Sequence, residues 1–170
     1  MSTVVHRQTL EIRESVNTPE YALSEWLIDA KIPEWPKRHW VRPITGDTIE
    51  QRSQELRDEA DAEDLEEQKQ NRITEIREQY NEALDSRYET RTLLYASYLL
   101  TKAMASMEEE TVEYLSGLAQ WVEDGDVLVE AAEELIESST TVENVQAVSL
   151  TLTSWLDADP KVSTRAARKL

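Results

Sequence analysis

The 170-residue chain carries 35 acidic and 18 basic side chains, and its net charge of −17 argues against DNA or RNA as the main partner. It has no cysteine, which excludes disulfides and thiolate metal sites, while five Trp and six Tyr are too many for a disordered chain. No apolar run approaches the ~18 residues of a membrane span, and the first residues lack the apolar region of a signal peptide. We therefore expect a soluble protein or part of a soluble assembly, with no membrane partner. Helix-forming composition explains most of the acid, and a high-salt habitat is the alternative.

Residues 1–52 are predicted to form an extended docking arm. Weak alternation over residues 3–14 indicates one short strand. Prolines between residues 19 and 43 exclude a long helix, although Thr18 as N-cap favours a short one from about Pro19 to Asp29. Large aromatic side chains on such a segment must be buried against a partner or against the helical body. The predicted partner-docking residues are Tyr21, Trp26, Trp35 and Trp40.

Residues 40–49 predict a small β-hairpin at the end of this arm. Thr45, Gly46 and Asp47 lie at its centre, and Gly46 permits the positive φ that tight hairpin turns require. The hairpin leads directly into the next element, for which Ser53 is a suitable N-cap.

A long helix is predicted from Ser53 because no Gly or Pro occurs before residue 107. Glu55 lies in its first turn, where the helix dipole favours an acid. The helix extends to about residue 123 unless it breaks near residues 107–111. Two hypotheses remain open for this helix. Either it packs on other helices while its polar first half projects into solvent or along a partner, or it is a solvated charged helix that packs only at its far end.

The second half of this helix carries an apolar stripe with steps of three and four residues. An extra step of four between Tyr80 and Arg91 forms a stutter, which locally unwinds a left-handed supercoil. The spacing predicts a coiled-coil-like helix that self-associates in parallel. The predicted self-association residues are Ile73, Ile76, Tyr80, Leu84, Tyr88, Tyr95 and Tyr98.

Short amphipathic helices are predicted to follow as a small bundle over residues 124–159. Asp124-Gly125-Asp126 favours a helix stop, after which a helix over residues 127–137 presents Leu128, Ala131, Ala132, Leu135 and Ile136. Thr140 with Glu143 matches a capping box, and opens a last helix that carries Val142, Val145, Val148, Leu152, Trp155 and Leu156. We expect these helices to pack on the Ile73–Val122 region. The basic tail over residues 160–170 is predicted to be a disordered terminus, or to lie on an acidic neighbour.

The sequence predicts no catalytic, cofactor-binding or metal-binding residues, and hence no enzyme. His6 and His39 are the only histidines, and neither has a carboxylate at the Glu-x-x-His spacing of di-iron bundles. Three glycines leave no phosphate-binding loop. The basic and aromatic side chains at residues 37–42 could stack on nucleic-acid bases. Docking of this cluster on an acidic face of another copy is the favoured interpretation.

A series of short segments follows in order through the N-terminal third: Ser15-Val16-Asn17-Thr18-Pro19-Glu20-Tyr21, Glu25-Trp26-Leu27-Ile28, Ile32-Pro33, His39-Trp40-Val41, Ile44-Thr45-Gly46-Asp47-Thr48-Ile49 and Ser53-Gln54-Glu55. In these segments the chain resembles a group of small proteins encoded among the tail and fibre genes of tailed bacteriophages. In that group a Trp- and Pro-bearing arm leads to a Gly-Asp hairpin and then to a long helix.

This resemblance implies a structural component of a tailed-phage virion, in the tail, collar or fibre region and assembled in the host cytoplasm. Other virion proteins would be its partners, and a homo-oligomer is implied, with a trimer favoured because phage fibres commonly are trimers. The alternative is an assembly chaperone or adaptor that is absent from the mature particle.

Overall fold

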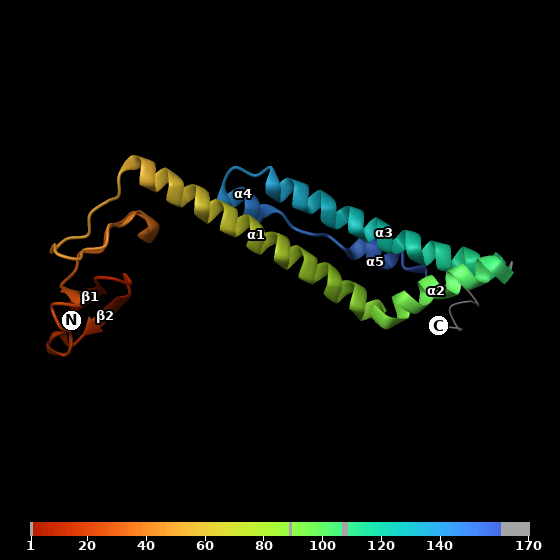
Figure 1. Cartoon of the computed structure of the whole chain (residues 1–170), viewed down its shortest axis with the longest axis horizontal. Helices are drawn as coiled ribbons and strands as arrows, with labels where there is room; N and C mark the ends of the chain where they lie inside the picture. Colours follow the sequence, from red (N-terminus) through yellow and green to blue (C-terminus); the bar gives the residue numbers. More distant parts are fainter. Residues whose placement is uncertain (1, 89, 107–108, 161–170) are drawn as a thin grey trace. The chain divides into compact units, whose positions relative to one another are not determined.

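The computed structural model describes residues 2–88, 90–106 and 109–160, with the side chains of residues 90–92 outside the description. The predicted fold class is confirmed, since the chain is mainly helical with a small β element at its N-terminus and a long helix after it (Figure 1). It divides into two compact units, Met1–Asp64 and Leu65–Leu170, and the division falls inside the long helix.

The N-terminal unit is built on a three-stranded antiparallel sheet in the order β2-β1-β3. These strands are β1 (Ser2–His6), β2 (Ile12–Val16) and β3 (Trp26–Ile28). The central strand pairs Val5 with Ile12 on one side and with Leu27 on the other. A bulge in β2 shifts the register between the Ser2 and Val4 pairs, close to Ser15, whose φ is 59°.

Two sequence predictions for this region are wrong. Residues 3–14 form two strands and not one, because the chain reverses between His6 and Glu11 with Leu10 at φ 58°. The helix predicted from Pro19 stops as the single 3-10 turn η1 (Thr18–Glu20), capped at Asn17. The following Trp26–Ile28 segment pairs with β1 instead, so a long-range pairing overrides the local signal.

The N-terminal unit has a core of its own, which corrects the expectation that its Trp side chains need a partner for burial. One face of the sheet is covered by a cluster in which Trp40 is only 2% exposed, and its indole N–H donates to the Trp35 carbonyl at 3.0 Å. Trp26 is buried on the other face, edge-on to the His6 and Tyr21 rings. The first cluster consists of Val5, Leu10, Leu27, Trp40 and Ile49.

The predicted hairpin over residues 40–49 is present in reduced form. Its two sides meet at one antiparallel bridge, Trp40 with Gln51, supported by a bond from the Val41 N–H to the Glu50 carbonyl at 2.7 Å. Gly46 does not take a positive φ, so the turn does not use the conformational freedom that the sequence suggested.

Helix α1 (Gln54–Arg87) begins where the sequence predicted. The Ser53 hydroxyl accepts the Leu56 N–H at a long 3.5 Å, and Glu55 lies in the first turn. Its polar start does not simply project into solvent, because Ala60 is buried within the N-terminal unit. The 3-10 turn η2 (Lys37–His39) lies against this start and supplies cations to its acids.

The helical unit differs from the prediction in where its helices break. The helix predicted over residues 53–123 ends first at Arg87, α2 covers Thr90–Ser106, and α3 covers Glu109–Glu137. The optional break near residues 107–111 therefore exists, although residues 107 and 108 lie outside the described residues. The break after Arg87 has no Gly or Pro to signal it. Tyr88 packs there on Trp121 and donates to Asp159 at 2.6 Å.

The predicted stop at residues 124–126 is also wrong, because α3 runs through it without a break. Gly125 is buried inside α3, and a Cβ there would lie 2.7 Å from ring carbons of both Trp155 and Tyr80. Glycine is required at this position for close packing and not for a helix end. The buried face of α3 accordingly includes Val129, Ala132 and Ile136, while Leu135 is 61% exposed.

The last helices are shorter than predicted. Helix α4 (Val142–Ala147) is capped by Thr141, whose hydroxyl accepts the Asn144 N–H at 3.2 Å, one residue later than the predicted Thr140. The single helix expected up to Leu156 is interrupted after α4 and resumes as α5 (Thr153–Asp157). The basic tail was predicted over residues 160–170, and of these residues 161–170 lie outside the described residues.

The predicted bundle on the Ile73–Val122 region does form. Residues 138–160 return along α3, with α4 and α5 packed on it (Figure 1). The Lys69 ammonium donates to the Glu137 backbone carbonyl at 2.8 Å. The Arg77 guanidinium donates two hydrogen bonds to the Glu133 carboxylate, at 2.6 and 2.8 Å. These contacts join α1 to α3 at their polar edges.

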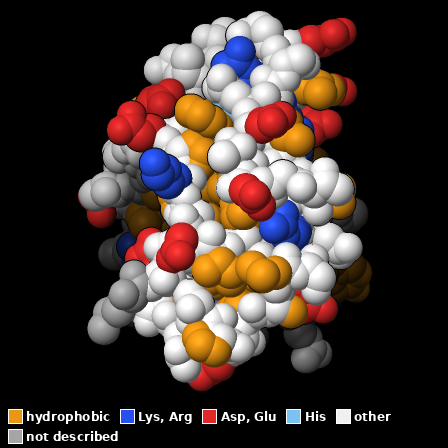
Figure 2. All heavy atoms as spheres, turned by 90° about the vertical axis from the view of Figure 1, so that its left-hand side faces the viewer, with side chains coloured by type: hydrophobic (Ala, Val, Ile, Leu, Met, Phe, Trp, Pro, Cys, Tyr) orange, Lys and Arg blue, Asp and Glu red, His pale blue; other side chains and the backbone are white. Residues whose placement is uncertain are grey.

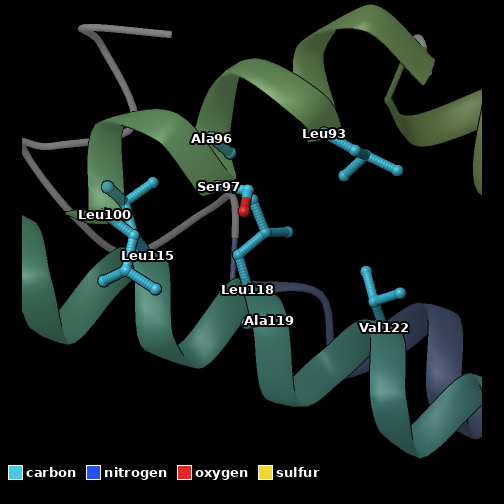
Figure 3. Close-up of a pocket in the computed structure, with 8 residues that line it drawn as sticks. All are labelled: Leu93, Ala96, Ser97, Leu100, Leu115, Leu118, Ala119 and Val122. Carbon is cyan, nitrogen blue, oxygen red and sulfur yellow. The ribbon is translucent and has the colours of Figure 1, made fainter.

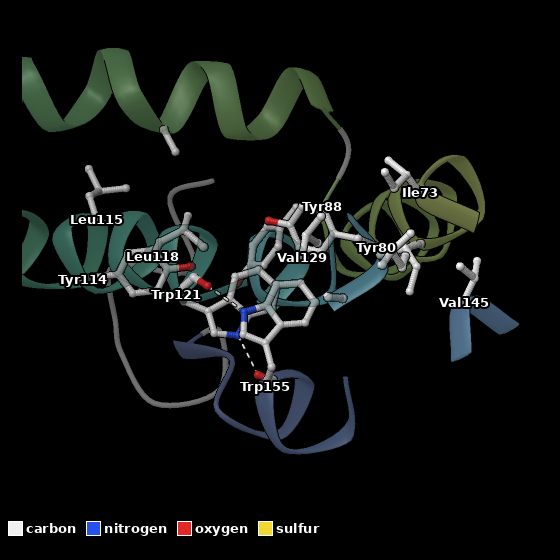
Figure 4. Close-up of a cluster of buried hydrophobic side chains, with 14 residues drawn as sticks. Ile73, Tyr80, Tyr88, Tyr114, Leu115, Leu118, Trp121, Val129, Val145 and Trp155 are labelled. Atoms are coloured by element: carbon white, nitrogen blue, oxygen red, sulfur yellow. Dashed lines mark hydrogen bonds between the residues drawn. The ribbon is translucent and has the colours of Figure 1, made fainter. Parts of the chain in front are cut away.

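At the centre of the bundle, Trp121 of α3 and Trp155 of α5 form a reciprocal pair (Figure 4). Their rings are stacked at 4.2 Å with an interplanar angle of 5°. Each indole N–H donates to the backbone carbonyl of the other residue, at 2.7 and 2.6 Å. Gly125 makes this possible, since Trp155 can approach α3 closely only where no side chain intervenes. The pair therefore fixes residues 153–157 on α3, which in turn supports α2.

Candidate docking surfaces

The predicted self-association stripe is divided between the core and the surface. Ile73, Ile76, Tyr80 and Tyr88 are at most 7% exposed and belong to the core of the helical unit, with Leu84 half-buried beside them. This corrects their predicted role, because side chains that pack within their own chain are not available to another copy. Tyr95 and Tyr98, by contrast, are 51% and 61% exposed. The side chain of Arg91 lies outside the described residues.

The buried tyrosines act as structural hydrogen-bond donors. Burial, with a bond to Asp126 as the next cause, raises the pKa of Tyr80, whose hydroxyl donates to the Val122 carbonyl at 3.2 Å. Burial also raises the pKa of Tyr88, with bonds to Asp159 and Tyr114 as further causes. Both hydroxyls therefore stay protonated and hold α1 to the rest of the bundle.

Helix α2 has an inner side that packs on α3 and leaves a pocket between them (Figure 3). The pocket has a volume of about 240 Å³ and is half-open to solvent. Among the described residues that line it, Ser97 supplies a hydroxyl and the other side chains are apolar. Its lining is Leu93, Ala96, Ser97 and Leu100 of α2, with Leu115, Leu118, Ala119 and Val122 of α3.

The outer side of α2 is also apolar, and we call it the α2 outer face. Its large exposed members are Leu94 (71%), Met104 (64%) and the stacked pair Tyr95 and Tyr98, whose ring centroids are 6.1 Å apart. Thr101 and Ala105 continue the same side and are exposed. Single exposed apolar residues are ordinary, but a contiguous group on one helix indicates an interaction surface.

Charge is distributed unevenly along the chain. Residues 1–53 contain seven Lys or Arg and eight Asp or Glu, for a net charge of −1, whereas residues 54–170 contain 11 and 27, for −16. Within the acidic part, α2 is the one described α-helix without Asp or Glu. Residues 1–53 and α2 are therefore two stretches in which a partner meets little net negative charge.

The N-terminal unit exposes several apolar side chains of its own. On the face of the molecule shown in Figure 2, apolar side chains lie open between separate acidic and basic ones. Of the predicted docking residues, Trp35 is 36% exposed and Tyr21 is half-buried, whereas Trp26 and Trp40 are buried. Leu23 and Ile44 are more exposed than any of these, at 71% and 67%. Sequence reasoning missed them because it weighed aromatic side chains alone.

Arg7, which directly follows strand β1, binds two loops of this unit. Its Nε donates to the Leu23 carbonyl at 3.0 Å, and its Nη1 donates to the carbonyls of Pro43 and Gly46 at 2.6 and 2.7 Å. The Arg7 side chain itself is only 12% exposed. One guanidinium thereby organises two loops that carry the exposed Leu23 and Ile44.

We expect Arg7→Lys to loosen both loops, since a lysine ammonium cannot reach three carbonyls in these directions. The loss of charge-assisted bonds is expected to cost about 1–3 kcal/mol of local stability. Amide hydrogen exchange of residues 22–27 and 43–47 in the full chain measures it. Arg42→Lys, an exposed arginine in the same loop, is the control and should leave the exchange rates unchanged. Equal protection in wild type and Arg7→Lys would contradict this role.

The two histidines have structural partners. The His6 Nδ1 accepts the N–H groups of Thr9 and Gln8, at 3.1 and 3.3 Å, and closes the turn after β1. The His39 Nε2 lies 2.8 Å from the Asp61 carboxylate, which also accepts the Arg38 guanidinium. The basic cluster that the sequence assigned to another copy therefore contacts acids of the same unit.

Asp61 is expected to stabilise the start of α1 in a pH-dependent way. Bonds from Arg38 first, and then from His39, lower the pKa of the Asp61 carboxyl. A carboxyl whose pKa is lower in the folded state stabilises that state fully above its unfolded pKa, and the effect disappears as the pH falls through the folded value. Since Asp61 is 45% exposed, we expect at most about 1 kcal/mol.

Amide exchange of residues 57–64 measures this contribution above and below about pH 4, the ordinary range of a carboxyl. Wild type should lose protection on acidification, and Asp61→Asn should show the lower protection already at neutral pH. Asp58→Asn, one turn earlier on α1, is the control and should behave as wild type. Unaltered protection in Asp61→Asn at neutral pH would refute the assignment.

In residues 2–88, 90–106 and 109–160, no group of three or more His, Asp or Glu side chains is placed to hold a metal ion. No helix in this part of the chain is long and apolar enough to cross a membrane. No protein-family model, curated protein or solved structure matches the chain.

Proposed function

We propose that this protein is a structural component of a tailed-phage virion that acts through docking on other virion proteins and through self-association. The observation that carries the proposal is the α2 outer face, an apolar and acid-free surface on a chain with a net charge of −17. Such a surface is unfavourable in water unless it is covered by a partner. The phage setting rests on the resemblance of the first third of the chain.

Two surfaces divide the proposed roles. The N-terminal unit exposes Leu23, Trp35 and Ile44 on residues 1–53, whose net charge is −1, and is the proposed dock for another virion protein. The α2 outer face is the proposed site of self-association. The expected homo-oligomer rested on the stripe from Ile73 to Tyr98, and the trimer rested on the resemblance to phage fibre proteins. Most of that stripe lies in the core, so we assign self-association to the α2 outer face.

The proposal does not include an enzymatic activity. The His6 imidazole is engaged in a turn and the His39 imidazole in a hydrogen bond with Asp61, and the raised pKa values of Tyr80 and Tyr88 suit permanent hydrogen-bond donors. The pocket between α2 and α3 offers one hydroxyl, Ser97, among apolar side chains. General acid–base chemistry needs a titratable group within reach of a substrate, and none is among the described residues that line this pocket.

Quantitative mass spectrometry of purified phage particles tests the proposal. A structural component should be recovered in fixed proportion to other virion proteins and remain after repeated density-gradient purification. Recovery from infected cells together with absence from particles would contradict it and favour an assembly chaperone, for which the half-open apolar pocket would be a suitable client site.

A further inference from the structure

We infer that the α2 outer face pairs with the same face of a second copy in an antiparallel arrangement, giving a two-fold symmetric dimer. The inference rests on the proposed self-association and specifies its surface, its geometry and its partner. It arises from three features of α2: the spacing of its exposed residues, their order of size, and the absence of carboxylates along the helix.

The spacing suits a pair of helices. Leu94, Tyr98, Thr101 and Ala105 follow one another at steps of four, three and four, which is the seam of a two-helix coiled coil. All four are exposed, and the inner residues Ala96 and Ala103 are buried on the opposite side. One side of α2 is therefore buried against its own chain, and the opposite side is exposed to solvent.

The order of size selects the antiparallel direction. The two large seam residues, Leu94 and Tyr98, come first, and the two small ones, Thr101 and Ala105, come last. When two such helices run in opposite directions, Leu94 meets Ala105 of the second copy and Tyr98 meets Thr101. Large side chains then interdigitate with small ones, whereas a parallel pair would oppose large to large and small to small. A two-fold axis produces both contacts twice, as a self-complementary interface requires.

Charge selects a second copy as the occupant. Two chains of −17 repel each other wherever acidic faces meet, and α1, α3, α4 and α5 all carry Asp or Glu. No carboxylate occurs between Thr90 and Ser106. Lys102 is the exposed cation on this side, and in the antiparallel pair it lies on the same flank as Tyr95 of the second copy, where a cation over a ring is favourable.

Native mass spectrometry of the full chain tests the surface. Wild type should show a species of twice the 19.6 kDa chain mass at micromolar concentration. The double variant Leu94→Glu/Tyr98→Glu places carboxylates on the seam and should weaken dimerisation by at least about tenfold, the effect of 1.4 kcal/mol. Leu135→Glu, at a 61% exposed leucine of α3, is the matched control and should dimerise as wild type. Circular dichroism of each variant verifies that the helices are retained.

Disulfide trapping tests the antiparallel direction of the two α2 helices. The sequence has no cysteine, so only introduced cysteines can form a disulfide. In the antiparallel pair the two copies of residue 105 are eleven residues apart along the axis, about 16 Å, which is too far for a disulfide. Ala105→Cys alone should therefore not cross-link under mild oxidation, whereas an equal mixture of Leu94→Cys and Ala105→Cys should form a mixed dimer.

Three results would overturn the inference: a monomeric wild type, a dimer that Leu94→Glu/Tyr98→Glu leaves intact, or a disulfide between two copies of Ala105→Cys. These outcomes are separate from the particle test. A chain found in virions but monomeric in solution would refute the dimer and leave the structural role standing, and a dimer absent from particles would do the reverse.

Discussion

Replacing Trp155 with alanine is expected to lower the free energy of unfolding of the helical unit by about 3–5 kcal/mol, the usual range for a large buried aromatic. The side chain is 5% exposed and stacks on Trp121 at 4.2 Å. Its loss leaves a cavity between α3 and α5 and removes the indole donor from the Trp121 carbonyl. Urea unfolding followed by circular dichroism measures the change.

Two further variants separate the causes. Trp155→Phe keeps a ring in the stack and removes the N–H donor, so it should cost less than Trp155→Ala, by an amount that reflects retained packing. Trp35→Ala is the control, because this indole is 36% exposed and lies in the N-terminal unit. Equal stability of wild type and Trp155→Ala would show that the Trp121–Trp155 pair does not hold the bundle together.

Gly125→Ala is expected to destabilise the same unit, by about 1–3 kcal/mol, as overpacking of a filled core does. The new methyl carbon would lie 2.7 Å from ring carbons of Trp155 and of Tyr80, closer than carbon atoms can approach. Neither ring can move aside freely, because the Trp155 indole N–H donates to the Trp121 carbonyl and the Tyr80 hydroxyl donates to the Val122 carbonyl. The urea midpoint of the variant measures the effect.

Gly117→Ala is the matched control on the same helix. Nothing lies within 4 Å of a Cβ at this position, so alanine gains only its better helix propensity, up to about 1 kcal/mol. The two substitutions are chemically identical, and their effects on the free energy of unfolding should have opposite signs. A stabilising Gly125→Ala would mean that α3 and α5 do not approach as closely as the Trp121–Trp155 pair requires.

Local patterns in the sequence predicted the features that depend on local physics. Ser53 was predicted as the start of α1, and the helix begins at the next residue. The stripe of Ile73, Ile76 and Tyr80 was predicted as a packing face, and all three side chains are buried. Hydroxyl caps and the 3.6-residue period are written within a few neighbouring residues, so they can be read without knowledge of the fold.

Features that depend on distant contacts were missed. The end of α1 at Arg87 follows from the contacts of Tyr88 with Trp121 and Asp159, which are remote in sequence. Gly125 was interpreted as a helix stop, because its packing role depends on Trp155. The sequence likewise offered no register by which β3 could be assigned to β1, so its residues were assigned to a helix.

The candidate surfaces were predictable only in part. Tyr95 and Tyr98 were predicted for self-association and are exposed, but the remaining stripe residues are occupied within the chain. An apolar residue on a helix has the same sequence signal whether it faces its own core or another molecule. The absence of acid from α2 was visible in the sequence, and its significance emerged only when the outer face was found to be exposed.

Sedimentation equilibrium of the full-length chain over a range of micromolar concentrations tests most directly the claim that its apolar surface serves association. The account predicts a mass that rises with concentration from 19.6 kDa toward twice that value, and less steeply for Leu94→Glu/Tyr98→Glu. A mass of 19.6 kDa at every concentration, with native helicity, would contradict it.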